Sequence, residues 1–161
     1  MDVVGRISAQ WRERYPDMDL SPIEVIGRVR RLGVLSGQMP ERVLGEPRLS
    51  RVELEVLSAL RRSGGQMRPS LLTRETLSSG AATSKRLAKL AEEGLISRSA
   101  SGRDRREIDV RLTERGREVI DRVLPAQIEW ERELLAPLSD AERAQLADLL
   151  AKVLGPLDPP A

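Results

Sequence analysis

Residues 78–116 read SSGAATSKRLAKLAEEGLISRSASGRDRREIDVRLTERG, and this stretch decides the fold. After a short turn at 78–80, apolar residues recur at helical spacing over residues 81–93, and Gly94 ends the helix. An amphipathic helix of this length fits the major groove of duplex DNA. Its face expected to be buried carries Thr83, Leu87 and Leu90.

Two short strands follow this helix. Residues 95–98 begin with two apolar side chains, and residues 108–112 alternate apolar with charged ones, which is typical of a half-buried strand. The segment between them, 99–107, is polar and contains three arginines. The pattern predicts a β-hairpin, so that a groove-sized helix is followed by a basic wing.

Further helices are expected on the N-terminal side. Capping boxes at 21–24 and 50–53 predict helices over about 21–44 and from 50 to the glycine pair at 64–65. A short helix from Pro69 then completes a helix-turn-helix. Its expected apolar residues are Leu71, Leu72 and Leu77.

A first helix is expected over residues 3–15, where Pro16 ends it. Its apolar residues recur at intervals of four and are expected to pack the helix against the rest of the protein. They are Ile7, Trp11 and Tyr15.

The C-terminal part is expected to be helical. Thr113 and Glu114 suit a helix start, and the helix that follows has a long apolar face and is expected to kink at Pro125. A third capping box at 139–142 starts the last helix.

Composition excludes several classes of function. The chain has no cysteine and no histidine, so disulfides, Cys/His zinc sites and catalysis by these side chains are excluded. It shows no phosphate-cradling glycine loop and no nucleophile–base pair, so we expect neither an enzyme nor a cofactor. It also shows no leader segment and no apolar run of membrane-spanning length, which predicts a cytoplasmic protein without a membrane partner.

Positive charge is concentrated in the middle of the chain. Residues 61–111 hold twelve lysines and arginines but six aspartates and glutamates, a surplus of six in a protein of net charge +2. A local basic surface suits a polyanion bound by one face, whereas a merely solvated charged surface is the alternative from charge alone.

Helix geometry assigns the DNA contacts. If Thr83, Leu87 and Leu90 point inward, small and polar residues point outward and Lys89 lies at the margin. Small side chains let the backbone approach base edges, and lysines meet phosphate or guanine. The expected DNA contacts are Ser79, Ala81, Ser84, Lys85 and Lys89 in the turn and helix, and Arg103, Arg105 and Arg106 in the wing. Asp104 is expected to pair with Arg106 and shape the wing, with a solvated loop charge as the alternative.

The flanking helices carry more apolar surface than one small winged domain can bury, which predicts a homodimer. We therefore expect a mainly α (α+β) fold, with a single domain over residues 1–161. Residues 48–112 would form the winged helix-turn-helix lobe, and residues 1–47 and 113–155 the dimerisation helices. Residues 156–161 would form a tail.

The string Asp104-Arg105-Arg106, followed after five residues by Leu112-Thr113-Glu114-Arg115-Gly116, resembles the D-x-R…L-T-x-x-G signature of MarR-family transcriptional regulators. The resemblance implies a homodimer with two winged helix-turn-helix lobes that represses by binding a pseudo-palindromic DNA site. It also implies release of the DNA by a small anionic or phenolic ligand.

The first helix with Trp11 is similar to that of the urate-responsive subgroup of this family. That resemblance implies a ligand site of Trp11, Arg86 and Arg98, with Glu55 where the subgroup carries an aspartate. Two arginines and a tryptophan suit a planar or carboxylate-bearing ligand. The alternative is that both arginines are structural ion-pair partners of Glu55.

These features together predict a DNA-binding transcriptional regulator, released from its operator by a small organic acid or phenolic. The alternative is a winged-helix protein–protein interaction module without ligand sensing.

Overall fold

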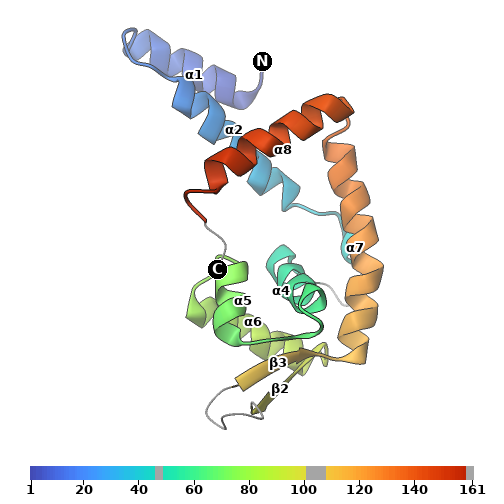
Figure 1. The fold of residues 1–161 in the computed structure, drawn as a ribbon. Coiled ribbons are helices and arrows are strands. Elements are labelled where there is room, and N and C mark those ends of the chain that lie inside the picture. Colours follow the sequence, from blue (N-terminus) through green and yellow to red (C-terminus); the bar gives the residue numbers. More distant parts are fainter. Residues whose placement is uncertain (46–48, 101–107, 159–161) are drawn as a thin grey trace. The chain divides into compact units, whose positions relative to one another are not determined.

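The computed structural model describes residues 1–45, 49–100 and 108–158, and the chain divides into two compact units, residues 1–39 and 40–161. The described residues form helices and one small antiparallel sheet, which confirms the mainly α class (Figure 1). None of the described helices is long and apolar enough to cross a membrane. The first unit contains α1 (Val3–Arg14) and α2 (Ser21–Ser36); the second contains α3 (Glu41–Leu44), α4 (Arg51–Arg62), β1 (Gln66–Met67), α5 (Pro69–Glu75), α6 (Gly80–Glu92), β2 (Ile96–Ala100), β3 (Ile108–Leu112), α7 (Glu114–Leu134) and α8 (Asp140–Leu154).

In the first unit, α1 packs on α2 through residues with short side chains. Val4 is buried against Gly27, where a Cβ atom would lie 2.9 Å from Val4 Cγ1. The buried Ser8 hydroxyl donates to Glu24 Oε1 at 2.9 Å. The prediction that the apolar stripe is the packing face of α1 was wrong. The buried contacts to α2 come from Val4 and Ser8, because a glycine and a hydrogen bond permit a close approach there. The stripe residues Ile7, Trp11 and Tyr15 stay exposed.

The second predicted helix differs at both ends. The capping box at 21–24 is absent, because Asp19 Oδ1 accepts from the Ser21 backbone N–H and the Glu24 carboxylate instead contacts α1. The helix ends at Ser36 rather than near residue 44, and α3 is a separate turn. Pro40 explains the break, since proline lacks an N–H donor and disfavours helical backbone in the residue before it.

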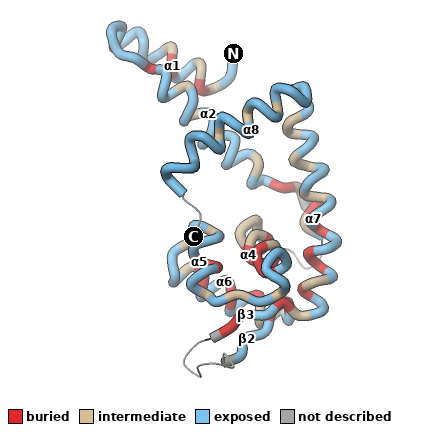
Figure 2. Tube along the Cα trace, in the orientation of Figure 1, coloured by how far each residue is buried: buried red, intermediate tan, exposed pale blue. Residues whose placement is uncertain are grey.

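The hydrophobic core of the second unit lies between α4, α5, α6, the sheet and the first half of α7 (Figure 2). α4 begins with the predicted capping box of Ser50 and Glu53. Leu72 is fully buried as expected, but Leu77 is 83% exposed and has a φ of 46°, so its assignment to the apolar face was wrong. The fully buried aliphatic side chains are Leu49, Leu54, Val56, Leu57, Leu60, Leu72, Leu87, Leu90, Leu95, Val110, Ile120 and Val123.

The sheet has the strand order β1-β3-β2, and both pairs are antiparallel. The hairpin of β2 and β3 confirms the predicted wing strands, whereas the two-residue β1 was missed because it is too short to show a period. Asp109 was expected on the polar face of its strand. It is buried instead, because Gln66 Nε2 on β1 donates to Asp109 Oδ2 at 2.6 Å and satisfies the carboxylate.

The junction between β3 and α7 explains the residues Leu-Thr-x-x-Gly at 112–116. Thr113 caps α7 by accepting from the Gly116 N–H at 3.0 Å, and its hydroxyl donates to the Gly94 carbonyl at 2.7 Å. Gly116 lies directly on Leu95, since a Cβ atom there would be 2.0 Å from the Leu95 carbonyl oxygen. This part of the signature therefore joins the start of α7 to the chain that follows α6.

The two C-terminal helices are less buried. α7 continues through Pro125 to Leu134, but its fully buried residues end at Val123. α8 begins with the predicted capping box of Ser139 and Glu142, and none of its residues is buried (Figure 2). Both helices thus present apolar side chains that the single chain leaves exposed.

Candidate nucleic-acid interface

The helix α6 is placed as a recognition helix requires. Ser79 caps it, with its hydroxyl oxygen accepting from the Ala82 N–H at 3.3 Å. The three residues predicted to face inward are all buried, which confirms the helical phase on which the assignment of the outward residues depends. They are Thr83, Leu87 and Leu90.

The opposite face of α6 is open. Ser79, Ala81, Ser84 and Lys85 are exposed, as is Ala88 one turn further on. Lys85 makes no ion pair or hydrogen bond to any residue that the structure describes, so its ammonium group is available to a phosphate or a guanine. The alanine and serine side chains on this face are short enough for the helix backbone to come close to base edges.

Lys89 differs from the other predicted contacts. Its Nζ atom lies 2.8 Å from Glu53 Oε1 on α4, and the side chain of Glu53 is only 6% exposed. A second carboxylate oxygen, Glu93 Oε1, lies 3.7 Å away. The hydrogen bond to Glu53 raises the pKa of the Lys89 ammonium above its usual value. Lys89 is therefore directed to the body of the lobe and not to the outward face.

The pKa of Glu53 reports the same contact. Burial raises the pKa of this carboxyl group, but hydrogen bonds from Lys89 and Ser50 outweigh burial, so the pKa lies below its usual value. Sequence reasoning missed Glu53 as a site residue. Its place in the capping box was visible, but only the packing of α4 against α6 brings it to Lys89.

The strands β2 and β3 of the predicted wing form a hairpin, and β2 contacts α6. Its predicted contacts Arg103, Arg105 and Arg106, and the predicted wing-shaping residue Asp104, lie outside the described residues. At the base of the hairpin, Arg98 Nη2 on β2 donates to the backbone carbonyl of Ser84 at 3.2 Å. The wing strand and the recognition helix are thus directly linked.

The predicted ligand residues of the second unit have separate partners. Arg86 Nη1 donates to Ser78 Oγ at 2.9 Å, in the turn before α6. Glu55 Oε1 accepts from Arg51 Nε at 3.1 Å, and neither Arg86 nor Arg98 is its ion-pair partner among the described residues. The alternative of an ion pair between these arginines and Glu55 was therefore wrong.

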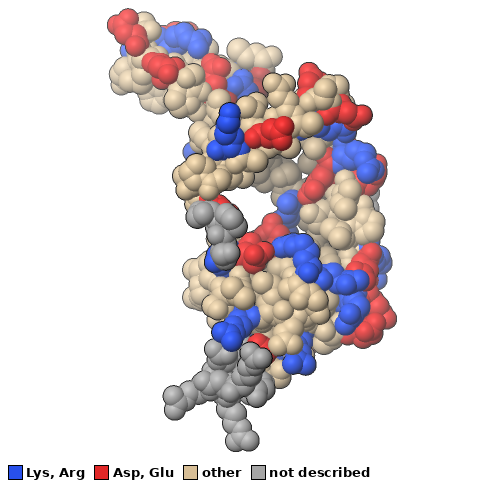
Figure 3. Space-filling view, in the orientation of Figure 1, with Lys and Arg blue, Asp and Glu red and all other residues tan. Residues whose placement is uncertain are grey.

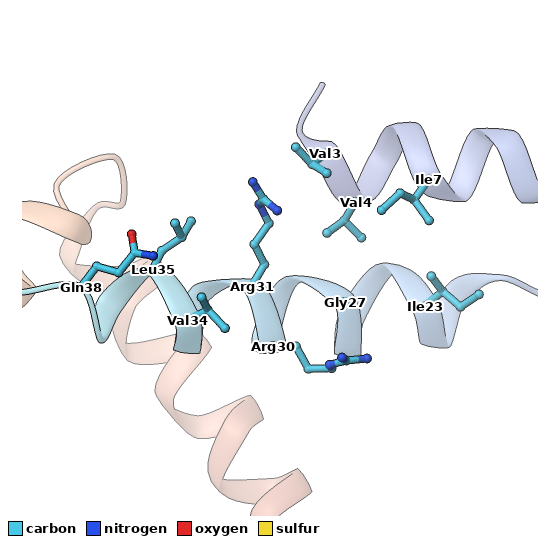
Figure 4. Close-up of a pocket in the computed structure, with 10 residues that line it drawn as sticks. All are labelled: Val3, Val4, Ile7, Ile23, Gly27, Arg30, Arg31, Val34, Leu35 and Gln38. Carbon is cyan, nitrogen blue, oxygen red and sulfur yellow. The ribbon is translucent and has the colours of Figure 1, made fainter. Parts of the chain in front are cut away.

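Trp11, the fourth predicted ligand residue, belongs to the first unit. It is 46% exposed, and its ring centroid lies 5.7 Å from that of Tyr15. Trp11 does not line the groove of about 560 Å³ between α1 and α2 (Figure 4). In that groove Val4 and Ile7 point from α1 toward α2, and two arginines of α2 lie among apolar side chains (Figure 4).

A smaller cavity of about 250 Å³ lies against α6 in the second unit. It brings together Lys85, Arg86 and Lys89, one carboxylate from Glu53, and Ala82. On the face drawn in Figure 3, basic side chains are spread over the lobe that contains α4 to β3, and acidic ones accompany them along α7. Positive charge on this lobe is thus not spread evenly, because acidic side chains accompany the basic ones along α7.

Comparison with known proteins identifies this arrangement. Residues 49–107 match the model of the MarR family. The HTH-type transcriptional regulator PecS of Dickeya dadantii (strain 3937) is 33% identical over 152 residues, which cover 93% of this chain and 92% of PecS. The chain belongs to the MarR family. The relatives of this MarR-family protein are transcriptional regulators, which confirms the prediction that it is not an enzyme.

Solved structures agree in fold. Bordetella bronchiseptica BpsR, whose DNA binding is regulated by 6-hydroxynicotinic acid, has a TM-score of 0.73 and 24% identity, covering 81% of this chain and 98% of its own. A mutant MarR from E. coli in complex with operator DNA has a TM-score of 0.74 and 23% identity, covering 85% and 99%. At these identities they show the fold of the MarR-family protein and confirm the predicted winged helix-turn-helix.

Proposed function

We propose that this MarR-family protein is a repressor that binds a pseudo-palindromic operator as a homodimer, through α6 in the major groove and the β2–β3 wing beside it. We propose further that a small anionic or phenolic molecule releases it from the DNA. The observation that carries the proposal is the outward face of α6. There Ser84 and Lys85, which has no partner among the described residues, lie among alanines above a buried face.

Each proposed contact has a chemical role. Lys85 can meet guanine or phosphate, and the Ser84 hydroxyl can donate to or accept from a base edge. Ser79 uses its hydroxyl oxygen to cap the helix and lies at the helix start, where backbone N–H groups favour a phosphate. Arg103, Arg105 and Arg106 stay predicted wing contacts for a minor groove or phosphate.

Homodimerisation is supported by the apolar side chains that the chain leaves exposed. α8 has no buried residue, and none of the residues of α2 is buried. A two-fold dimer with two copies of α6 suits a palindromic site, whose half-sites lie about one turn of DNA, ~34 Å, apart. The exposed aliphatic residues of these helices include Ile26, Val29, Leu32, Leu149, Val153 and Leu154.

Release by a ligand is supported by the relatives, of which BpsR is regulated by an aromatic acid. Arg86 lines a cationic cavity against α6, and Arg98 binds the α6 backbone. A ligand that pairs with either arginine would compete with a contact that holds the recognition helix, and the free energy of that competition would shift the population of DNA-competent dimers. The set of Trp11, Glu55, Arg86 and Arg98 stays a prediction, as does the cytoplasmic location.

The test is fluorescence anisotropy with DNA from the region upstream of the protein's own gene, compared with random DNA of equal length at physiological salt. We expect clear preference for the upstream DNA, and weaker binding to that DNA with Lys85→Ala. Equal affinity for both DNAs, together with capture of a protein partner, would favour the alternative of a protein–protein interaction module.

The ligand is tested separately by a thermal-shift screen of organic acids and phenolics, followed by anisotropy with any stabilising compound. We expect a compound that both raises the melting temperature and releases the DNA, and we expect Arg86→Ala to remove both effects. A hit that Arg86→Ala leaves unchanged would contradict the proposed ligand site.

A further inference from the structure

One buried carboxylate joins the recognition helix to the helix behind it. Glu53 is the third residue of α4, and its two oxygen atoms have different partners. Oε2 accepts from the Ser50 backbone N–H at 2.7 Å and closes the capping box. Oε1 faces the Lys89 ammonium on α6 at 2.8 Å. The start of α4 and the third turn of α6 are therefore held by the same side chain.

The two side chains of this ion pair are buried to different extents. The side chain of Glu53 is 6% exposed, so its charge needs both of its partners, whereas the side chain of Lys89 is 47% exposed and reaches inward from the surface. A buried carboxylate that loses its cation is strongly disfavoured. Rotation of α6 about its own axis would carry Lys89 away from Glu53, so the pair resists that rotation.

The neighbouring turn of α6 provides a contrast. Lys85 lies four residues before Lys89, lines the same cavity, and has no partner among the residues that the structure describes. Both lysines were predicted to contact DNA from their sequence spacing. Their surroundings differ, because Glu53 of α4 lies 2.8 Å from the Lys89 ammonium, whereas Lys85 makes no ion pair with a described residue.

From this contrast we infer that Glu53 and Lys89 are positioning residues. They set the rotation of α6 so that Ser84 and Lys85 face the DNA, and Lys89 does not itself contact a phosphate. The inference rests on the proposed function, since it specifies which lysine of the recognition helix reads DNA. It assigns to Glu53, on a helix that does not enter the groove, a part in DNA specificity.

The salt dependence of binding separates the two roles. Each phosphate contact contributes a slope of about 0.9 to the fall of log affinity with log salt concentration. Lys85→Gln is expected to lower this slope by about one and to weaken binding to upstream and random DNA alike. Lys89→Gln is expected to keep the salt slope and the affinity for random DNA. Its affinity for upstream DNA is expected to fall by about tenfold, the effect of one lost base contact.

Two further variants test whether the pair acts as a unit. Lys89→Arg keeps the cation and is expected to retain specific binding, whereas Glu53→Gln is expected to match Lys89→Gln. The double variant Glu53→Gln/Lys89→Gln is expected to lose no more than either single variant. A lower salt slope in Lys89→Gln, or additive losses in the double variant, would overturn the inference.

Hydrogen exchange of the free protein provides a measurement without DNA. Lys89→Gln and Glu53→Gln are expected to speed exchange of the backbone amides of α6, and Lys85→Gln is expected to leave them unchanged. If the amides of α6 exchange at the same rate in all three variants, the inference is overturned. If the unmodified protein shows no preference for upstream DNA, the proposed function fails, while the exchange measurement still decides whether the pair positions α6.

Discussion

Gly116 is the residue at which the smallest substitution is expected to have the largest structural effect. In Gly116→Ala the new Cβ atom would lie 2.0 Å from the Leu95 carbonyl oxygen and 2.9 Å from Leu112 Cδ1. Ordinary van der Waals contact begins at 3.4 Å, so the start of α7 and the chain at Leu95 must separate by at least about 1.4 Å. The Leu112 side chain can rotate, but the Leu95 carbonyl belongs to the backbone and cannot rotate away.

The magnitude follows from two opposing terms. Overpacking costs about 1–3 kcal/mol, and a clash with backbone belongs at the upper end of that range. Within a helix, alanine is more favourable than glycine by up to about 1 kcal/mol, which offsets part of this cost. The net loss is about 2 kcal/mol, which corresponds to a fall of roughly 4–8 °C in melting temperature for a chain of this size. The hydrogen bond from Thr113 to the Gly94 carbonyl would lengthen with the separation.

Thermal unfolding at a fixed protein concentration measures this loss, and Gly80→Ala is the matched control. Gly80 also lies at the start of a helix of the winged lobe, but a Cβ atom there meets nothing within 4 Å. We expect Gly80→Ala to be as stable as the unmodified protein or slightly more stable. If Gly116→Ala has the same melting temperature as the Gly80→Ala control, the close approach of α7 to Leu95 is refuted.

Three other substitutions test separate features. Leu77→Gly is expected to stabilise by about 0.5–1 kcal/mol, because Leu77 has a φ of 46° and is 83% exposed; a lower melting temperature would contradict this. Ser139→Ala removes the hydroxyl that accepts from the Glu142 N–H and is expected to cost about 1 kcal/mol in urea unfolding, whereas no loss would argue against the cap. Because the pKa of Glu53 lies below its usual 4.5, its ionised form stabilises the fold fully above that pH and loses its effect as the pH falls through the folded-state pKa. Glu53→Gln is therefore expected to flatten the acid limb of stability measured by urea unfolding from about pH 7 to pH 3, and an unchanged limb would contradict the assignment.

Local signals predicted many of the elements correctly. The capping boxes at Ser50 and Ser139 and the cap at Thr113 are all formed, because each depends on residues within one helical turn. The failed box at Ser21 had the same pattern, but Asp19 and the contact of Glu24 with α1 outcompeted it. A capping pattern thus predicts a helix start only where no nearby group takes the same donors and acceptors.

Periodicity was reliable where one element met one core and unreliable elsewhere. Thr83, Leu87 and Leu90 are buried as predicted, since the whole buried face of α6 packs on the lobe. On α1 the regular stripe is exposed and the helix packs through Ser8 and Val4, because Gly27 permits a close approach that hydrophobicity does not reveal. Asp109 is buried for a similar reason, since its partner Gln66 is distant in sequence.

The sequence by itself determined the family, the winged helix-turn-helix and the outward face of the recognition helix. These follow from helical phase, local caps and the signature that links wing and helix. Only the tertiary structure decided which of the two lysines has an ion-pair partner among the described residues. Helical phase places Lys85 outward and Lys89 at the margin of that face, but only the packing of α4 on α6 brings the buried Glu53 within 2.8 Å of the Lys89 ammonium. The charge environment of a side chain is set by neighbours across the fold, and spacing along the chain does not encode it.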